Sequence, residues 1–135
     1  MPQFRRAIII GASSGIGLAL ARALVATGAQ VALVARRAAE LDRAVADLGP
    51  QRARAYPHDV TQTDAIPALF AAIAHDLGGV DLVVYAAGIL PDQPQDAYDT
   101  ALDAQIIAIN FTGAVAWLNA AAARFTRTRD GTIIG

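Results

Sequence analysis

Three glycines that follow a short apolar run restrict the fold of this chain more than any other feature of its sequence. The stretch reads IIIGASSGIG and contains Gly11, Gly15 and Gly17. Residues without a Cβ allow a sharp turn, let backbone amides approach a ligand and let a following helix pack close to a strand. The stretch therefore predicts a strand, a tight turn and a helix, with an anion site where unpaired N–H groups and the helix dipole favour negative charge.

Apolar runs alternate with helical patterns along the whole chain. Strands are predicted at residues 7–10, 30–35, 52–56 and 81–85, with a fifth, buried strand from Thr132. Helices are predicted at residues 16–26, 38–48, 61–77 and 98–125. Thr61 and Asp64 are expected to cap the third helix, and the fourth is expected to divide near Ala101. This order predicts an α/β fold, a doubly wound parallel sheet with helices on both faces.

Composition limits the size and the partners of the chain. Residues 1–135 are expected to form one domain, because no linker or repeat interrupts them. Hydrophobic residues make up 55%, which indicates either membrane association or apolar surface that another part of the protein covers. A net charge of −1 argues against nucleic acid as a partner. The lack of cysteine fits a reducing compartment, so a cytoplasmic location is expected.

Two apolar segments could be taken for targeting signals. Residues 7–21 follow Arg5 and Arg6 as in a signal peptide, but their ordered glycines favour a strand, turn and helix. Residues 104–123 carry no charge and could span a membrane. Their unpaired side-chain amides would be costly in hydrocarbon. We therefore expect no membrane span, and a helix buried between protein surfaces.

The GxxxGxG spacing of GASSGIG resembles the cofactor loop of the short-chain dehydrogenase/reductase family. The resemblance implies a Rossmann-type sheet that binds NAD or NADP and supports hydride transfer between the nicotinamide and a carbonyl or alcohol substrate. It also implies that the loop residues bind the cofactor; these are Gly11, Ser13, Ser14, Gly15, Ile16 and Gly17.

The same residues offer a competing interpretation. Gly11 to Gly15 also matches GxSxG, the nucleophile elbow of α/β-hydrolases, with Ser13 as the nucleophile. Only ten residues precede Gly11, whereas part of the oxyanion hole should come from an earlier loop. The two histidines, His58 and His75, also lie too early in the chain for the acid-then-histidine order. Hydrolysis is therefore the weaker alternative.

The residues after the second predicted strand indicate which dinucleotide is bound. NAD-specific folds usually place a carboxylate there to hold the ribose hydroxyls. This chain has Ala35, followed by Arg36 and Arg37. A guanidinium can bind a 2′-phosphate by charge-assisted hydrogen bonds, so NADP (NADPH) is the expected cofactor. A solvated pair of arginines at a helix start is the alternative.

Two further stretches match motifs of the family. Asp59 and Val60 match the pair in which a carboxylate meets the adenine amino group and an apolar residue lines the adenine pocket; an aspartate that caps a helix is the alternative. The stretch YAAG resembles the NNAG or NAAG motif, whose small residues let the backbone pass close to the adenine ribose. Its matching residues are Ala86, Ala87 and Gly88. Tyr85 replaces the usual asparagine, so a stabilising side-chain bond is either lost or replaced.

Asn110 is the candidate catalytic residue. It lies three residues before Gly113 in an otherwise apolar helix. An amide is disfavoured there unless something binds it, and glycine weakens the helix further, so their combination indicates function. A polar group satisfied in a helix-helix contact is the alternative. By resemblance, Asn110 is the tetrad asparagine at a helix kink whose free carbonyl holds a water of the proton relay.

The remaining catalytic residues of the family are not found in the chain. The family carries a serine on its fifth strand and then a YxxxK helix, in which the lysine lowers the pKa of the tyrosine that acts as general acid or base. The chain contains no lysine, and its three tyrosines all precede the required position. We therefore expect the N-terminal portion of a longer enzyme, with these residues beyond residue 135; a non-catalytic NADP-binding or regulatory module is the alternative. By resemblance, residues 104–123 form a subunit-interface helix, which implies a homo-dimer or homo-tetramer.

Overall fold

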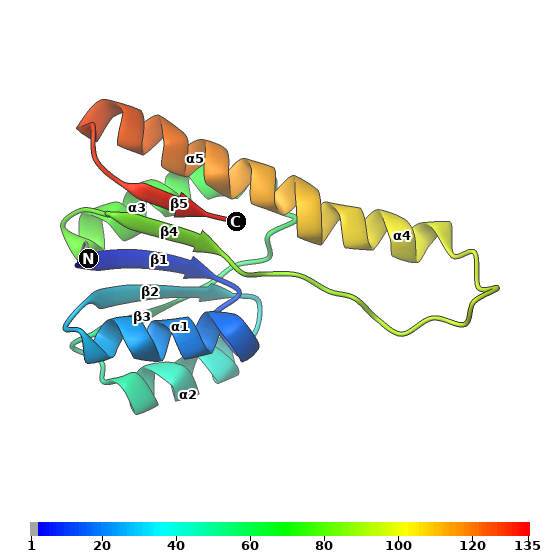
Figure 1. The fold of residues 1–135 in the computed structure, drawn as a ribbon, viewed down its shortest axis with the longest axis horizontal. Helices are drawn as coiled ribbons and strands as arrows, with labels where there is room; N and C mark the ends of the chain where they lie inside the picture. The colour runs from blue at the N-terminus through cyan, green and yellow to red at the C-terminus, as the bar shows by residue number, and fades with distance from the viewer. Residues whose placement is uncertain (1–2) are drawn as a thin grey trace.

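In the computed structural model, which describes residues 3–135, five parallel strands form one sheet in the order β3-β2-β1-β4-β5 (Figure 1). The strands are β1 Arg6–Ile10, β2 Gln30–Ala35, β3 Ala53–Pro57, β4 Leu82–Tyr85 and β5 Thr132–Ile134. The helices are α1 Gly15–Ala26, α2 Ala38–Leu48, α3 Ile66–Leu77, α4 Thr100–Ile107 and α5 Gly113–Thr128, with a 3₁₀ turn η1 Thr63–Ala65 and a π-helical segment η2 Ala108–Thr112. The predicted α/β fold with a doubly wound parallel sheet is confirmed.

Helices cover the sheet on both faces because its strands are apolar on both sides. In β1, Ile8 and Ile10 face the core formed with α3 and α5, in which Trp117 is fully buried. The alternate residue Ile9 faces the core formed with α1 and α2, which includes Leu41. The chain therefore forms two apolar layers, one on each side of the sheet.

The long helix differs from the prediction in the place where it is interrupted. α4 starts at Thr100, where the Asp99 carboxylate accepts a hydrogen bond of 3.1 Å from the Leu102 amide, and it continues through Ala101 without a break. The irregular segment is η2, directly before Gly113. The expected break near Ala101 is therefore wrong: the aspartate begins the helix there, and the irregular segment lies further along.

The long helix buries one face and leaves another exposed within residues 3–135. One face of α5 packs on the sheet through every fourth residue, namely Gly113, Trp117, Ala121 and Phe125. On another face, Ile107, Phe111 and Val115 are exposed by 57%, 66% and 43%. The helix Thr100–Thr128 is long and apolar enough to cross a membrane, and 17% of its most apolar window is buried. A single such helix is weak support for a membrane span, because core helices of soluble proteins have the same length and composition.

β5 pairs with β4 on one side, and its three residues are exposed within residues 3–135, while the sequence predicts that residues beyond 135 cover this strand. One expectation about the third helix is wrong. Thr61 does not cap the third helix: its amide and hydroxyl both donate to the Asp59 carboxylate, at 2.9 and 2.8 Å. The chain then passes through η1, and α3 begins at Ile66 with Pro67 in its first turn.

Candidate nucleotide-binding site

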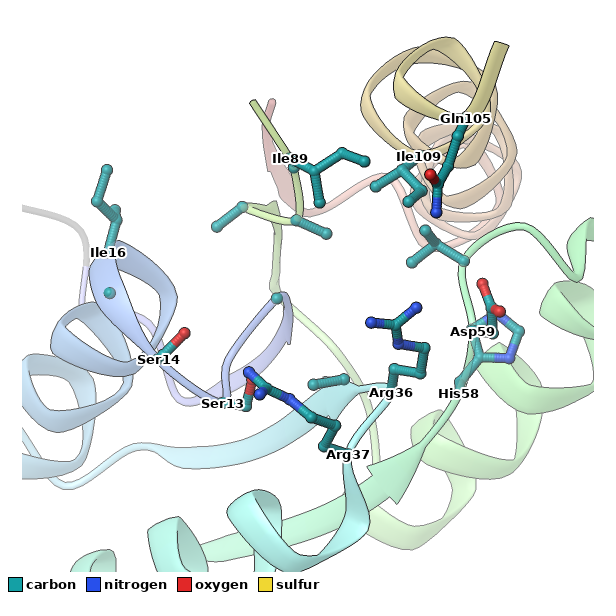
Figure 2. A pocket seen from close by; sticks show the side chains of 17 residues that line it. Ser13, Ser14, Ile16, Arg36, Arg37, His58, Asp59, Ile89, Gln105 and Ile109 are labelled. Atoms are coloured by element: carbon teal, nitrogen blue, oxygen red, sulfur yellow. The ribbon is translucent and has the colours of Figure 1, made fainter. Parts of the chain in front are cut away.

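A cavity of about 500 Å³ opens at the carboxyl ends of the parallel strands, a size typical of ligand sites (Figure 2). Ligands of open α/β sheets bind at this edge, where the strand order reverses. Here the reversal lies between β1 and β4. The cavity is lined by Gly11, Ser13, Ser14, Gly15, Ile16, Ala35, Arg36, Arg37, His58, Asp59, Val60, Ala86, Ala87, Gly88, Ile89, Gln105 and Ile109.

The glycine turn is shaped by close backbone contacts. A Cβ added to Gly11 would lie 2.5 Å from the Ala87 amide nitrogen, and one added to Gly17 would overlap the Gly11 carbonyl oxygen. Gly15 has open space around it but a left-handed φ of 58°. The turn therefore brings β1 against the β4 loop, and it directs the start of α1 toward the cavity.

The two serines and Ile16 lie at the N-terminus of α1. Ser14 is the N-cap residue, and within residues 3–135 its side chain makes no capping hydrogen bond. The first amides of α1 and this hydroxyl are consequently available to a ligand. Ile16 is 82% exposed and lines the cavity. Unpaired donors and the helix dipole at this point favour an anion.

The two arginines after β2 differ in their partners. Arg37 is the N-cap residue of α2, and its Nη1 lies 2.8 Å from the Glu40 carboxylate. Among residues 3–135, Arg36 forms no ion pair. Figure 2 shows the Arg36 side chain extending into the cavity, which Arg37 also lines. Arg36 is therefore the guanidinium that is free to bind an anionic ligand group.

His58, Asp59 and Val60 form the wall beyond β3. The Thr61 amide and hydroxyl bonds hold the pKa of Asp59 below its usual value. Burial lowers the pKa of His58, whose ring packs edge-on against Trp117 at 5.6 Å between ring centres. The aspartate is thus kept ionised and the histidine neutral, at the part of the cavity where an adenine ring is expected.

The loop after β4 is tied to the long helix by Asn110. Its Oδ1 accepts from the Ile89 amide and its Nδ2 donates to the Ile89 carbonyl, both at 2.8 Å. A Cβ on Gly88 would lie 3.4 Å from the same Oδ1. Asn110 therefore fixes the backbone that follows the YAAG stretch, because its side-chain amide pairs with both the N–H and the C=O of one residue.

Most of the residues predicted for the site lie together. Twelve of them line the cavity, whereas Gly17 is buried within α1 and Asn110 is hydrogen-bonded to the Ile89 backbone. Sequence reasoning missed several lining residues: Ala35, His58, Ile89, Gln105 and Ile109. His58 and Ala35 could have been found, because they directly precede predicted site residues. Gln105 and Ile109 carry no local signal, since only the packing of the long helix brings them to the cavity.

The chain is similar in sequence to a family of known proteins. The sequence model of the short chain dehydrogenase family matches residues 5–135. The chain belongs to this family. It is 40% identical over 107 residues to galactitol 2-dehydrogenase (L-tagatose-forming) of Cereibacter sphaeroides, covering 79% of this chain and 42% of that one. It is 36% identical over 115 residues to gluconate 5-dehydrogenase of Gluconobacter oxydans, covering 80% and 45%.

Solved structures agree with the family assignment. A short-chain type dehydrogenase/reductase from Mycobacterium marinum superposes with a TM-score of 0.88 at 33% identity, covering 96% of this chain and 53% of that one. A short-chain dehydrogenase from Streptomyces avermitilis gives 0.86 at 29% identity, covering 96% and 47%. The chain therefore spans about half the length of these relatives. Membership of this family leaves the hydrolase interpretation of Ser13 without support.

Proposed function

We propose that residues 1–135 form the cofactor-binding portion of an NADP-dependent oxidoreductase, which transfers hydride between NADP(H) and a small carbonyl or alcohol substrate. The serine and the YxxxK tyrosine and lysine of the family are expected beyond residue 135. Asn110 is the proposed catalytic residue within the chain. We also retain the prediction of a cytoplasmic location.

The shape of the cavity supports a dinucleotide. The turn at Gly11 and Gly17 is closed by backbone contacts that a Cβ would disrupt, and the amides at the start of α1 suit a pyrophosphate. Asp59 and Val60 at the far wall suit an adenine ring. When bound, the nicotinamide nucleotide supplies the hydride; the residues of this chain hold and orient it.

One observation supports NADP over NAD: Arg37 is paired with Glu40, whereas Arg36 extends into the cavity and forms no ion pair among the described residues. No carboxylate stands at the end of β2 or directly after it, because Ala35 ends the strand and Arg36 and Arg37 follow. A charge-assisted bond from Arg36 to a 2′-phosphate is worth about 1.5–3 kcal/mol, which gives roughly ten- to hundredfold preference for NADP.

Fluorescence titration with NADPH and NADH tests this proposal. We expect tighter binding of NADPH, and we expect Arg36→Asp to remove that preference while affecting NADH little. Arg37→Ala is the matched control and should change the preference less, because Glu40 already engages this side chain. Equal losses for both nucleotides in Arg36→Asp would refute the cofactor assignment, and no binding of either would refute the proposed function.

A second candidate function is a non-catalytic NADP-binding or regulatory module. The observation in its favour is that the sequence has no lysine to assist a catalytic tyrosine. A purified product near 14 kDa that binds NADPH and lacks carbonyl reductase activity would support the module. Reductase activity in a longer product would support the enzyme.

We further propose a homo-dimer or homo-tetramer that assembles through the long helix. Ile107, Phe111 and Val115 recur every fourth residue and are exposed by 43–66%, which places three large apolar side chains on one helix face. Burial of this face against a second copy would remove it from water. Light scattering after size exclusion should give a mass that is a multiple of the monomer; a monomer at micromolar concentration would refute assembly.

A further inference from the structure

The π-helical segment η2 leaves one backbone carbonyl without its usual donor. In an α-helix the Gly113 amide would donate to the Ile109 carbonyl four residues earlier. Here it donates to the Ala108 carbonyl, five residues earlier. The Ile109 carbonyl thereby loses its α-helical partner, and an unpaired carbonyl in a partly buried position destabilises the fold.

A side chain from the sheet replaces that donor. The hydroxyl of Tyr85, the last residue of β4, donates to the Ile109 carbonyl at 2.5 Å. Tyr85 is 8% exposed, and burial raises its pKa to about 12, so the hydroxyl keeps its proton at neutral pH. This contact joins the strand that leads into the YAAG loop to the one irregular turn of the long helix.

Gly113 makes room for the contact. A Cβ on this residue would lie 2.7 Å from the Tyr85 hydroxyl oxygen and 3.0 Å from Val60 Cβ. Its φ of −61° is ordinary for a helix, so the need for glycine is one of space and not of backbone conformation. The absence of a Cβ on Gly113 therefore leaves the space that the Tyr85 hydroxyl occupies, where the long helix crosses the end of β4.

The two residues on either side of this carbonyl both belong to the site. Ile109 lines the cavity, and the next residue, Asn110, holds the Ile89 backbone through two bonds of 2.8 Å. Ile89 in turn lines the same cavity. A shift of the π turn would therefore move a cavity wall and the asparagine clamp together.

We propose that Tyr85 is a positioning residue: its hydroxyl holds the Ile109 carbonyl that η2 releases, and so places Asn110 against Ile89 at the cofactor cavity. It occupies the position where the family usually has asparagine, and it replaces the lost bond by one that reaches the helix instead. The role assigned to Asn110 rests on the proposed function; the contact itself does not.

Nuclear magnetic resonance of the chain labelled with ¹⁵N-asparagine tests this proposal. The sequence has two asparagines, Asn110 and the exposed Asn119 on α5, so each side-chain amide can be assigned with one variant, Asn119→Gln. We expect Tyr85→Phe to shift the Asn110 side-chain signals and leave those of Asn119 in place. In a second, uniformly ¹⁵N-labelled sample, the Ile89 amide should exchange roughly two- to tenfold faster in Tyr85→Phe, the range that one net hydrogen bond supports.

Tyr56→Phe is the matched control. Its hydroxyl also lies in a hydrogen bond of 2.7 Å, to Asp76 on α3, and its pKa is also raised to about 12, by burial and by that aspartate. Among the described residues its hydroxyl makes no hydrogen bond to η2, so the Asn110 signals should not move. Equal changes at both asparagines in Tyr85→Phe would indicate general loosening and would overturn the proposal, as would unchanged Asn110 signals.

A second measurement needs no variant, in case Tyr85→Phe does not fold. In the unaltered chain the Tyr85 hydroxyl proton should give a slowly exchanging resonance with a nuclear Overhauser contact to the Asn110 backbone amide. Rapid exchange of that proton would overturn the proposal. Neither measurement requires nucleotide, so failure to bind NADPH would refute the proposed function alone.

Discussion

The substitution Gly17→Ala separates helix propensity from close packing in the glycine turn. Gly17 lies inside α1 and is buried. Propensity alone predicts that alanine stabilises the helix by about 1 kcal/mol. The added Cβ would, however, overlap the Gly11 carbonyl oxygen and lie 2.9 Å from the Gly11 carbonyl carbon and 3.2 Å from Ala12 Cα.

All three of those atoms are backbone, so no side chain can turn aside to relieve the overlap. Overpacking of this kind costs about 1–3 kcal/mol, and the rigid surroundings favour the upper end. After the gain from propensity, we expect a net loss of about 2 kcal/mol. With a urea m value of about 2 kcal/mol per molar, the midpoint of unfolding should fall by about 1 M.

Urea unfolding followed by Trp117 fluorescence measures this change, and NADPH titration measures its effect on the site. Gly15→Ala is the matched control, because its Cβ would have open space and only the left-handed φ of 58° opposes it. It should cost about 1–2 kcal/mol through the backbone alone. A higher urea midpoint for Gly17→Ala than for the unaltered chain would refute the packing argument.

Two further predictions concern the packing of Trp117 and the protonation of His58. Trp117 is fully buried between α3 and the sheet, so Trp117→Ala should lower the free energy of unfolding by about 3–5 kcal/mol in urea unfolding followed by circular dichroism; a loss under 1 kcal/mol would contradict this packing. Burial lowers the pKa of His58 below 6.5, so its contribution to stability is complete above that pH and declines as the pH falls through the lower, folded-state pKa. The urea midpoint of His58→Gln should therefore fall less than that of the unaltered chain as the solution is acidified from about pH 7 to pH 5, and parallel declines would contradict this assignment.

Many of the residues that line the cavity could be predicted from sequence because they adjoin strand ends. In a parallel sheet the carboxyl ends of all strands meet at one edge, so Gly11, Arg36, Asp59 and Ala86 converge there once each strand is recognised. The lining residues on the long helix could not be predicted, since Gln105 and Ile109 reach the cavity only because of the way this helix crosses the sheet.

The distinction between Arg36 and Arg37 is a local one. Both follow β2, and Arg36 is favoured from sequence because it adjoins the strand end. The ion pair between Arg37 and Glu40 arises because residues three apart on a helix lie side by side. The irregular segment η2 contains Asn110, where the resemblance implies a helix kink, but no local pattern indicated that Tyr85 supplies the missing donor.

By itself the sequence determined the order of strands and helices, the parallel sheet and the glycine turn, because apolar periodicity and the lack of a Cβ act over a few neighbouring residues. Tertiary structure alone decided which face of the long helix packs on the sheet, that Gln105 and Ile109 reach the cavity, and that Tyr85 meets Ile109. Those outcomes depend on contacts between residues distant in the chain, which local pattern does not encode.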